Sequence, residues 1–176
     1  MGDSLITIVA IFLAAILMFV FPLMSISERN DDIAQLGVQT AVTEFVDTAT
    51  TTGKITLDEY SAFMQTLAAT GNSYDVEIER KVLDENPGKK TTWAVIDKIG
   101  ENTYYSVYTT QIEKELEENE ECLLKEGDVL SVSIKNTNTT ISQMLRNFFY
   151  TVSGKGTYQV MAQHAAMVKA NGVSNK

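Results

Sequence analysis

Residue types that build catalytic and metal sites are scarce in this sequence. It has one cysteine, Cys122, and one histidine, His164, which excludes an internal disulfide and leaves too few Cys and His ligands for a zinc site. Two prolines and ten glycines exclude a proline- and glycine-rich low-complexity chain. The sequence contains no G-x-G-x-x-G, Walker or nucleophile-elbow motif. We therefore expect a non-enzymatic protein with no metal, no cofactor and no small-molecule substrate.

Basic residues are also few. Lys and Arg number 14 against 23 Asp and Glu, which gives a formal net charge of −9. The basic residues form no stripe along any predicted element, so the chain lacks the positive surface that attracts nucleic acid or anionic membranes. Nucleic acid is not an expected partner.

No charged residue occurs between Asp3 and Glu28. Within this gap, the 20-residue stretch Leu5–Met24 contains 13 Leu, Ile, Val or Phe residues. A helix of about 20 such residues spans a hydrocarbon core of roughly 30 Å, and each residue favours insertion by about 0.3–0.6 kcal/mol. We therefore predict that residues 1–27 form a transmembrane anchor whose partner is membrane lipid. The residues expected to anchor and pack this helix, with Ala14-Ala15 as a small-residue contact point, are Leu5, Ile8, Ile11, Ala14, Ala15, Met18 and Pro22.

A cleaved secretory signal is the alternative interpretation of the same stretch. Ser25-Ile26-Ser27 matches a small-x-small cleavage pattern, but no Lys or Arg precedes the apolar run. The run also exceeds the usual apolar region of about 7–15 residues in a signal peptide, which favours a retained anchor. The flanking charges are too few for the positive-inside rule to assign the side of the membrane.

After the anchor, the chain keeps helical spacing. Pro22 predicts a kink rather than a stop, because the helical pattern continues beyond it. The following amphipathic helix is expected over residues 28–49, with its stripe at Val38, Val42, Phe45, Val46 and Ala49. Thr56 and Glu59 form a capping box that starts a second helix, residues 56–70, with Gly71 at its end.

Period-two patterns then predict an antiparallel sheet with inserted helices over residues 73–168. The strands are expected at Tyr74–Val82, Thr91–Ile99, Asn102–Thr109, Val129–Lys135 and Thr157–Val168. A helix is also compatible with the last of these segments. Short helices are predicted at Gln111–Cys122, with Ile112 and Leu116 inward, and after the capping pair Thr140 and Gln143. The predicted fold class is α+β: a long transmembrane helix continues into an amphipathic helix that packs on this sheet, within one domain of residues 28–176.

Three features resemble functional sites, and each also has a local explanation. Thr48–Glu59 matches the second half of a calcium-binding EF-hand loop, but threonine occupies the first, third and fifth ligand positions, which favours a simple helix–turn–helix. The acidic run Glu113–Glu121 could gather cations or meet a basic neighbouring subunit, although a solvated helix face is the commoner explanation. His164 could serve an anchored hydrolase, but without a nucleophile motif it is interpreted as a packed or edge histidine.

The order of these elements resembles the type IV pilin-like proteins, and the C-terminal half resembles the TadE-like minor pseudopilins of tight-adherence (Tad) systems. The resemblance rests on the apolar helix with Pro22, on Lys125-Glu126-Gly127-Asp128 leading into the strand VLSVSIK, and on the closing segment Tyr158–Val168. It implies a single-pass membrane subunit or assembly factor of a pilus, secretion or conjugation apparatus with an extracytoplasmic domain. Its implied partners are other pilin-like subunits, including copies of this chain, or secretion-apparatus proteins.

Within this resemblance, Gly2 is the candidate leader-cleavage residue. No basic residue precedes Gly2, and Thr7 stands where such pilins carry a glutamate, which favours a minor or membrane-retained subunit. A membrane-tethered extracytoplasmic ligand-binding or sensor module is the alternative function.

Overall fold

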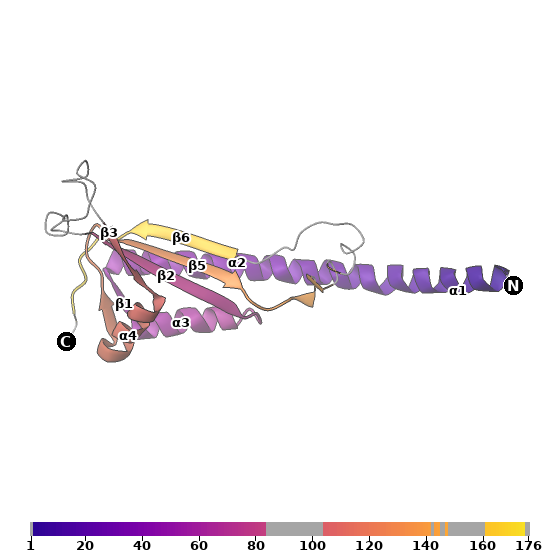
Figure 1. Ribbon diagram of the computed structural model, residues 1–176, viewed down its shortest axis with the longest axis horizontal. Coiled ribbons are helices and arrows are strands. Elements are labelled where there is room, and N and C mark those ends of the chain that lie inside the picture. The colour runs from indigo at the N-terminus through magenta and orange to yellow at the C-terminus, as the bar shows by residue number, and fades with distance from the viewer. Residues whose placement is uncertain (1, 84–103, 142, 145–146, 148–160, 175–176) are drawn as a thin grey trace, which may run out of the picture.

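The computed structural model describes residues 2–83, 104–141, 143–144, 147 and 161–174. The predicted strand Thr91–Ile99 and the beginning of the closing segment Thr157–Val168 lie outside the described residues. Within them, the fold is α+β, with a long N-terminal helix and antiparallel sheets (Figure 1).

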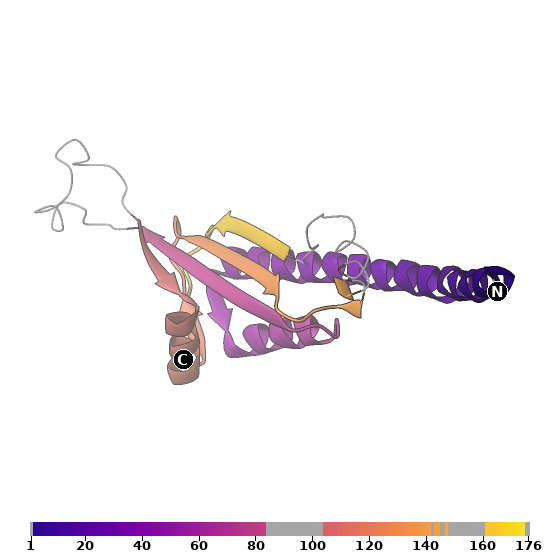
Figure 2. The same ribbon diagram turned by 45° about the vertical axis from the view of Figure 1, so that its right-hand side comes forward.

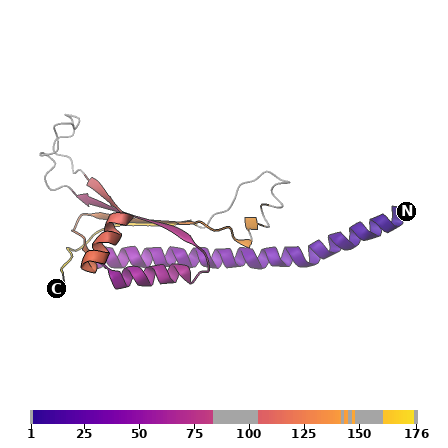
Figure 3. The ribbon, with the colours of Figure 1, turned by 60° about the horizontal axis from the view of Figure 1, so that its bottom comes forward.

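The N-terminal helix is continuous from α1 (Gly2–Ala15) through a π-helical turn, η1 (Ile16–Val20), into α2 (Phe21–Thr52). Pro22 is near the start of α2, directly after the π-helical turn. A proline lacks the N–H that would bond to the carbonyl four residues earlier, and a π-turn accommodates such a gap. Figure 3 shows that the helix bends between α1 and α2, so the chain continues through Pro22 and changes direction next to it.

The second half of α2 is amphipathic, as predicted. Its buried residues include the expected stripe of Val38, Val42, Phe45, Val46 and Ala49. The helix ends at Thr52, three residues later than predicted, where Gly53 takes a left-handed φ of 72° and its N–H bonds to the Ala49 carbonyl. Thr50 and Thr52 belong to this last turn, and their hydroxyls donate to carbonyls four residues back, Thr50 to Val46 at 2.8 Å and Thr52 to Thr48 at 2.9 Å.

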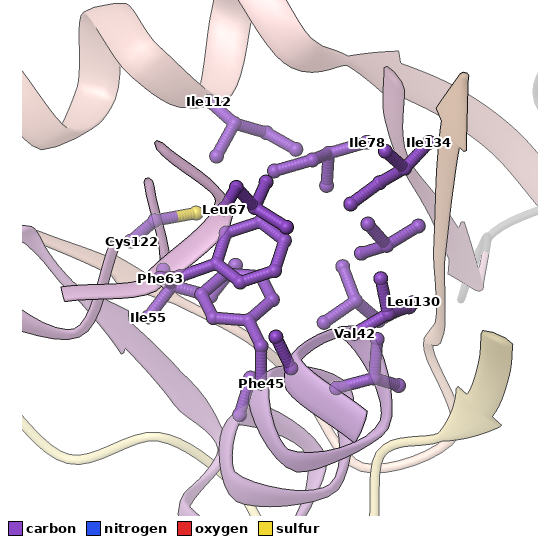
Figure 4. Close-up of a cluster of buried hydrophobic side chains, with 14 of the residues drawn as sticks. Val42, Phe45, Ile55, Phe63, Leu67, Ile78, Ile112, Cys122, Leu130 and Ile134 are labelled. Carbon is purple, nitrogen blue, oxygen red and sulfur yellow. The ribbon is translucent and has the colours of Figure 1, made fainter. Parts of the chain in front are cut away.

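Helix α3 (Leu57–Ala68) lies beside α2 and starts at the predicted capping box. The Thr56 hydroxyl accepts from the Glu59 N–H at 3.2 Å, and the Glu59 carboxylate accepts from the Thr56 N–H at 3.0 Å. The rings of Phe45 and Phe63 stack with centroids 4.4 Å apart and join the two helices (Figure 4).

The main sheet has four antiparallel strands in the order β3-β2-β5-β6. They are β2 (Tyr74–Leu83), β3 (Tyr104–Tyr108), β5 (Val129–Asn136) and β6 (Met161–Met167). The described part of the closing segment is therefore a strand, not a helix. Helices α2 and α3 cover one face of the sheet (Figure 3). The core between them contains Ile78, Leu130 and Ile134 from the sheet (Figure 4), all 0 % exposed. Val132 of β5 is also 0 % exposed.

A second, two-stranded sheet was not predicted. It pairs β1 (Lys54–Thr56) with β4 (Glu121–Leu123), so that Ile55 lies opposite Cys122. Between β3 and β4, helix α4 (Thr109–Asn119) lies at the end of the domain farthest from α1 (Figures 1 and 2). The prediction that this helix reaches Cys122 was wrong, because Glu120 adopts a left-handed φ of 63° and ends it.

Candidate assembly surface

The N-terminal half of the long helix exposes apolar side chains. Among the described residues, one helix, Ser4–Thr52, is long and apolar enough to cross a membrane, and its apolar part is not buried against the domain. Ile8 is 67 % exposed, Phe12 70 % and Met18 72 %. Apolar surface of this extent on a single helix is a site for lipid or for other helices.

The residues predicted to pack this helix all lie on its exposed part. Leu5, Ile8, Ile11 and Met18 are large exposed apolar residues, and Ala14, Ala15 and Pro22 are exposed as well. Helical spacing places Ile8, Ile11, Ala15, Met18 and Pro22 along one side, while Ala14 and Leu5 flank it. Gly2, the candidate cleavage residue, is the first residue of α1.

The exposed apolar surface continues from Ile26, near the end of the uncharged run, to Ile33 and Leu36 beyond it, which was not predicted. Ile26, Ile33 and Leu36 on α2 are 61 %, 62 % and 68 % exposed, although the sheet-facing side of the same helix is buried. Ile33 and Leu36 follow Ile26 by seven and ten residues, and residues at these spacings share one side of a helix. This spacing is the signal in the sequence that could have predicted the strip. The polar half of α2 therefore carries an apolar strip on the side that the domain leaves open.

The acidic run was predicted to be a solvated helix face, and the structure corrects this in part. The Tyr60 hydroxyl donates to Glu113 Oε1 at 2.6 Å, and the Cys122 thiol lies 3.3 Å from Glu115 Oε2. Burial, reinforced by the neighbouring Glu113 carboxylate, raises the pKa of Tyr60 above its ordinary value of 10.0. Two of the acidic residues thus hold α4 to the domain, while Glu118 is exposed.

The half EF-hand pattern has the local explanation that we favoured. The Glu59 carboxylate caps α3, Gly53 ends α2, and Ile55 belongs to β1. In the part of the chain that the structure describes, no group of three His, Cys, Asp or Glu side chains is arranged to hold a metal ion.

His164 lies on β6, the edge strand of the main sheet, as predicted for an edge histidine. Its Nε2 is 3.3 Å from Asp47 Oδ1 on α2, and both side chains are partly exposed. This contact joins the edge strand to the helix.

We expect the Cys122 thiol to be almost unreactive in the folded chain. Burial, with a contribution from Glu115 that Arg80 opposes in part, raises the pKa of Cys122 from 9.0 to about 12. Because the thiolate is the reactive form, the thiol should react with Ellman's reagent at pH 8 much more slowly in the folded chain than in urea. A Val173→Cys variant, at a position that is 72 % exposed, is the control and should react at the rate of an unfolded thiol. Equal rates for Cys122 in the folded and unfolded chains would contradict the burial.

The same shift predicts how Cys122 affects stability with pH. The unfolded thiol loses its proton near pH 9.0, whereas the folded thiol keeps it to about pH 12. The folded state therefore binds more protons in this range, and the contribution of Cys122 to stability is lost as the pH rises from about 9 towards 12.

Comparison of the chain with protein family models, with curated proteins and with solved structures found no match. The exposed helix and the α+β domain are therefore the features that support a functional proposal.

Proposed function

We propose that this chain is a pilin-like structural subunit, anchored in the membrane by residues 1–27 and associating with other subunits through its N-terminal helix. Its domain is extracytoplasmic, and the complex is a Tad-type pilus or a related secretion or conjugation apparatus. The protein acts by assembly and catalyses no reaction.

The observation that carries this proposal is one continuous helix whose two halves have different surroundings. Its first half exposes apolar side chains on all sides, and its second half is buried along one stripe under the sheet. Such a helix presents the domain on a stalk. Helices in lipid associate by close packing, for which small residues such as Ala14 and Ala15 permit short distances between backbones.

The exposed strip on α2 supports the same function. Ile26, near the end of the uncharged run, and Ile33 and Leu36 beyond it expose large apolar side chains. Packing between neighbouring subunits can therefore continue from the lipid into the polar half of the stalk, where burial of each such side chain stabilises the contact by roughly 1.5–3 kcal/mol.

Cysteine scanning of the full chain in its native membrane tests this proposal. We expect oxidation to give adducts heavier than the monomer when cysteine replaces Ile11, Ala15 or Met18, which share one side of the helix. Leu13→Cys, on the opposite side by helical spacing, is the matched control and should give far less adduct. Native Cys122 does not interfere, because it is fully buried.

Equal adducts at all positions, or none at any, would contradict association through one helix side. Two further measurements test the other parts of the proposal. The intact mass must show that residues before Glu28 are retained, since a chain that begins at Glu28 has lost the anchor. A Val173→Cys variant must react with a membrane-impermeant maleimide added outside the cell, as an extracytoplasmic domain requires.

A further inference from the structure

The segment after β5 is fixed to α2 just beyond the uncharged run. The Thr140 hydroxyl donates to Asp31 Oδ2 at 2.9 Å, and both residues are buried. Thr140 also starts a helical turn, since its N–H donates to Gln143 Oε1 at 3.2 Å and its hydroxyl accepts from the Gln143 N–H at 3.3 Å. Figures 1 and 3 show the described residues of this segment beside the long helix, on the side of the domain nearer to α1.

This attachment sets the height of the segment along the helix. Ser27, the last residue before the first charge of the domain, and Ile141 line the same cavity of about 330 Å³. Ser27 lies three residues beyond Met24, the last residue of the apolar stretch Leu5–Met24, which corresponds to about 4.5 Å along a helix. The polar headgroup layer on each side of the hydrocarbon core is about 5–8 Å thick, so Ser27 and the Ile141 side chain that shares its cavity lie at the level of the headgroups when Leu5–Met24 spans the core.

The turn exposes two large apolar side chains at this level. Ile141 is 56 % exposed and Met144 is 54 % exposed, whereas Thr140 and Gln143 between and beside them are buried. Residues three apart lie on the same side of a helical turn, so the two side chains form one apolar patch. Transfer of such side chains out of water is favourable.

We propose that Ile141 and Met144 insert into the membrane interface beside the anchor. They give the domain a second contact with lipid, which fixes its tilt and rotation relative to the membrane. The contact is apolar and needs no anionic lipid, in keeping with the acidic charge of the chain. This proposal rests on the membrane anchor of the proposed function, but not on assembly into a filament.

Lipid quenching of a fluorophore tests the contact. The full chain carries Met144→Cys, labelled with an environment-sensitive dye, and is reconstituted into phosphatidylcholine nanodiscs with or without nitroxide-labelled lipid. Met167→Cys is the matched control, because Met167 has the same chemistry and a similar exposure of 56 %, and ends strand β6 on the side away from α1 (Figure 1). Met18→Cys, in the anchor, reports whether the helix is inserted.

We expect the dye at position 144 to be quenched several-fold more than the dye at 167 and to emit at shorter wavelength. Ile141→Cys should behave in the same way, which guards against a local effect of one substitution. Quenching at 144 no greater than at 167, with strong quenching at 18, would overturn the contact and leave the anchor intact. A blue-shifted dye at 144 without lipid quenching would also overturn it, since protein would then cover the patch. No quenching at position 18 would refute the anchor itself.

Discussion

Replacement of Gly53 by alanine is expected to lower the free energy of unfolding by about 3 kcal/mol. The left-handed conformation at φ 72° costs a residue with a Cβ about 1–2 kcal/mol. A Cβ at this position would also lie 2.3 Å from the Ala170 carbonyl oxygen and 2.6 Å from the Gly172 nitrogen. These are backbone atoms that cannot turn aside as a flexible side chain can, and overpacking of this kind typically costs about 1–3 kcal/mol more.

The close approach exists because the C-terminal segment, residues 169–172, packs over the end of α2. The Gly53 carbonyl accepts from the Leu124 N–H at 2.8 Å, and the Leu124 carbonyl accepts from the Gly172 N–H at 2.9 Å. The Lys169 N–H donates to the Thr50 carbonyl at 2.9 Å. An added Cβ at position 53 would push this segment away and break these hydrogen bonds, so their amide protons should exchange faster in the variant.

Gly71→Ala is the control for the conformational part of this effect. Gly71 has a similar φ of 78°, but a Cβ there would meet nothing within 4 Å. Its expected cost is therefore the conformational one alone, about 1–2 kcal/mol. Urea unfolding of the detergent-solubilised full chain, followed by circular dichroism, measures both variants. Equal costs would show that the C-terminal segment does not close over Gly53.

Local patterns were sufficient for most of the fold. The capping box at Thr56 and Glu59 and the alternating pattern of Val129–Lys135 each involve residues close in sequence. Both were confirmed, the second as strand β5. The pairing of β1 with β4 was missed because each strand has three residues, too few to show a period of two. That pairing also joins Ile55 to Cys122, and no local signal relates residues so far apart.

The site was only partly predictable for the same reason. The exposed apolar helix follows directly from the missing charges between Asp3 and Glu28. The segment at Thr140 was recognised as a helix start, but its position depends on a hydrogen bond to Asp31, 109 residues earlier. Sequence spacing cannot reveal such a contact, and the level of Ile141 relative to the anchor therefore required the structure.

A buried ion pair links β2 to Asp128, the residue that precedes β5, and it too was missed. Arg80 lies on the inward side of β2, where an alternating pattern predicts an apolar residue. Its Nη2 is 2.8 Å from Asp128 Oδ2, and the two side chains are 11 % and 1 % exposed. The Asp128 carboxylate also accepts from the N–H groups of Leu83 and Lys125, both at 3.1 Å.

Asp128→Ala is therefore expected to lower the free energy of unfolding by about 3–5 kcal/mol, because it leaves a buried guanidinium without its counter-charge. Glu118→Ala is the control, since the Glu118–Lys114 pair is 3.8 Å long and its side chains are 63 % and 73 % exposed. An exposed pair of this kind contributes at most about 0.5 kcal/mol. Urea unfolding of both variants measures the difference, and similar small losses would contradict a structural role for the pair.

The double variant Arg80→Met and Asp128→Ala separates the cost of the unpaired charge from the loss of the other contacts. With the guanidinium removed, the unpaired charge disappears, so the double variant should be more stable than Asp128→Ala alone. Coupling energies of about 0.5–3 kcal/mol are usual for residues in direct contact. Part of the loss should remain, because the N–H groups of Leu83 and Lys125 still lack the carboxylate that accepts from them. A double variant no more stable than the single one would mean that these two backbone groups, and not the Arg80 charge, account for the effect of Asp128.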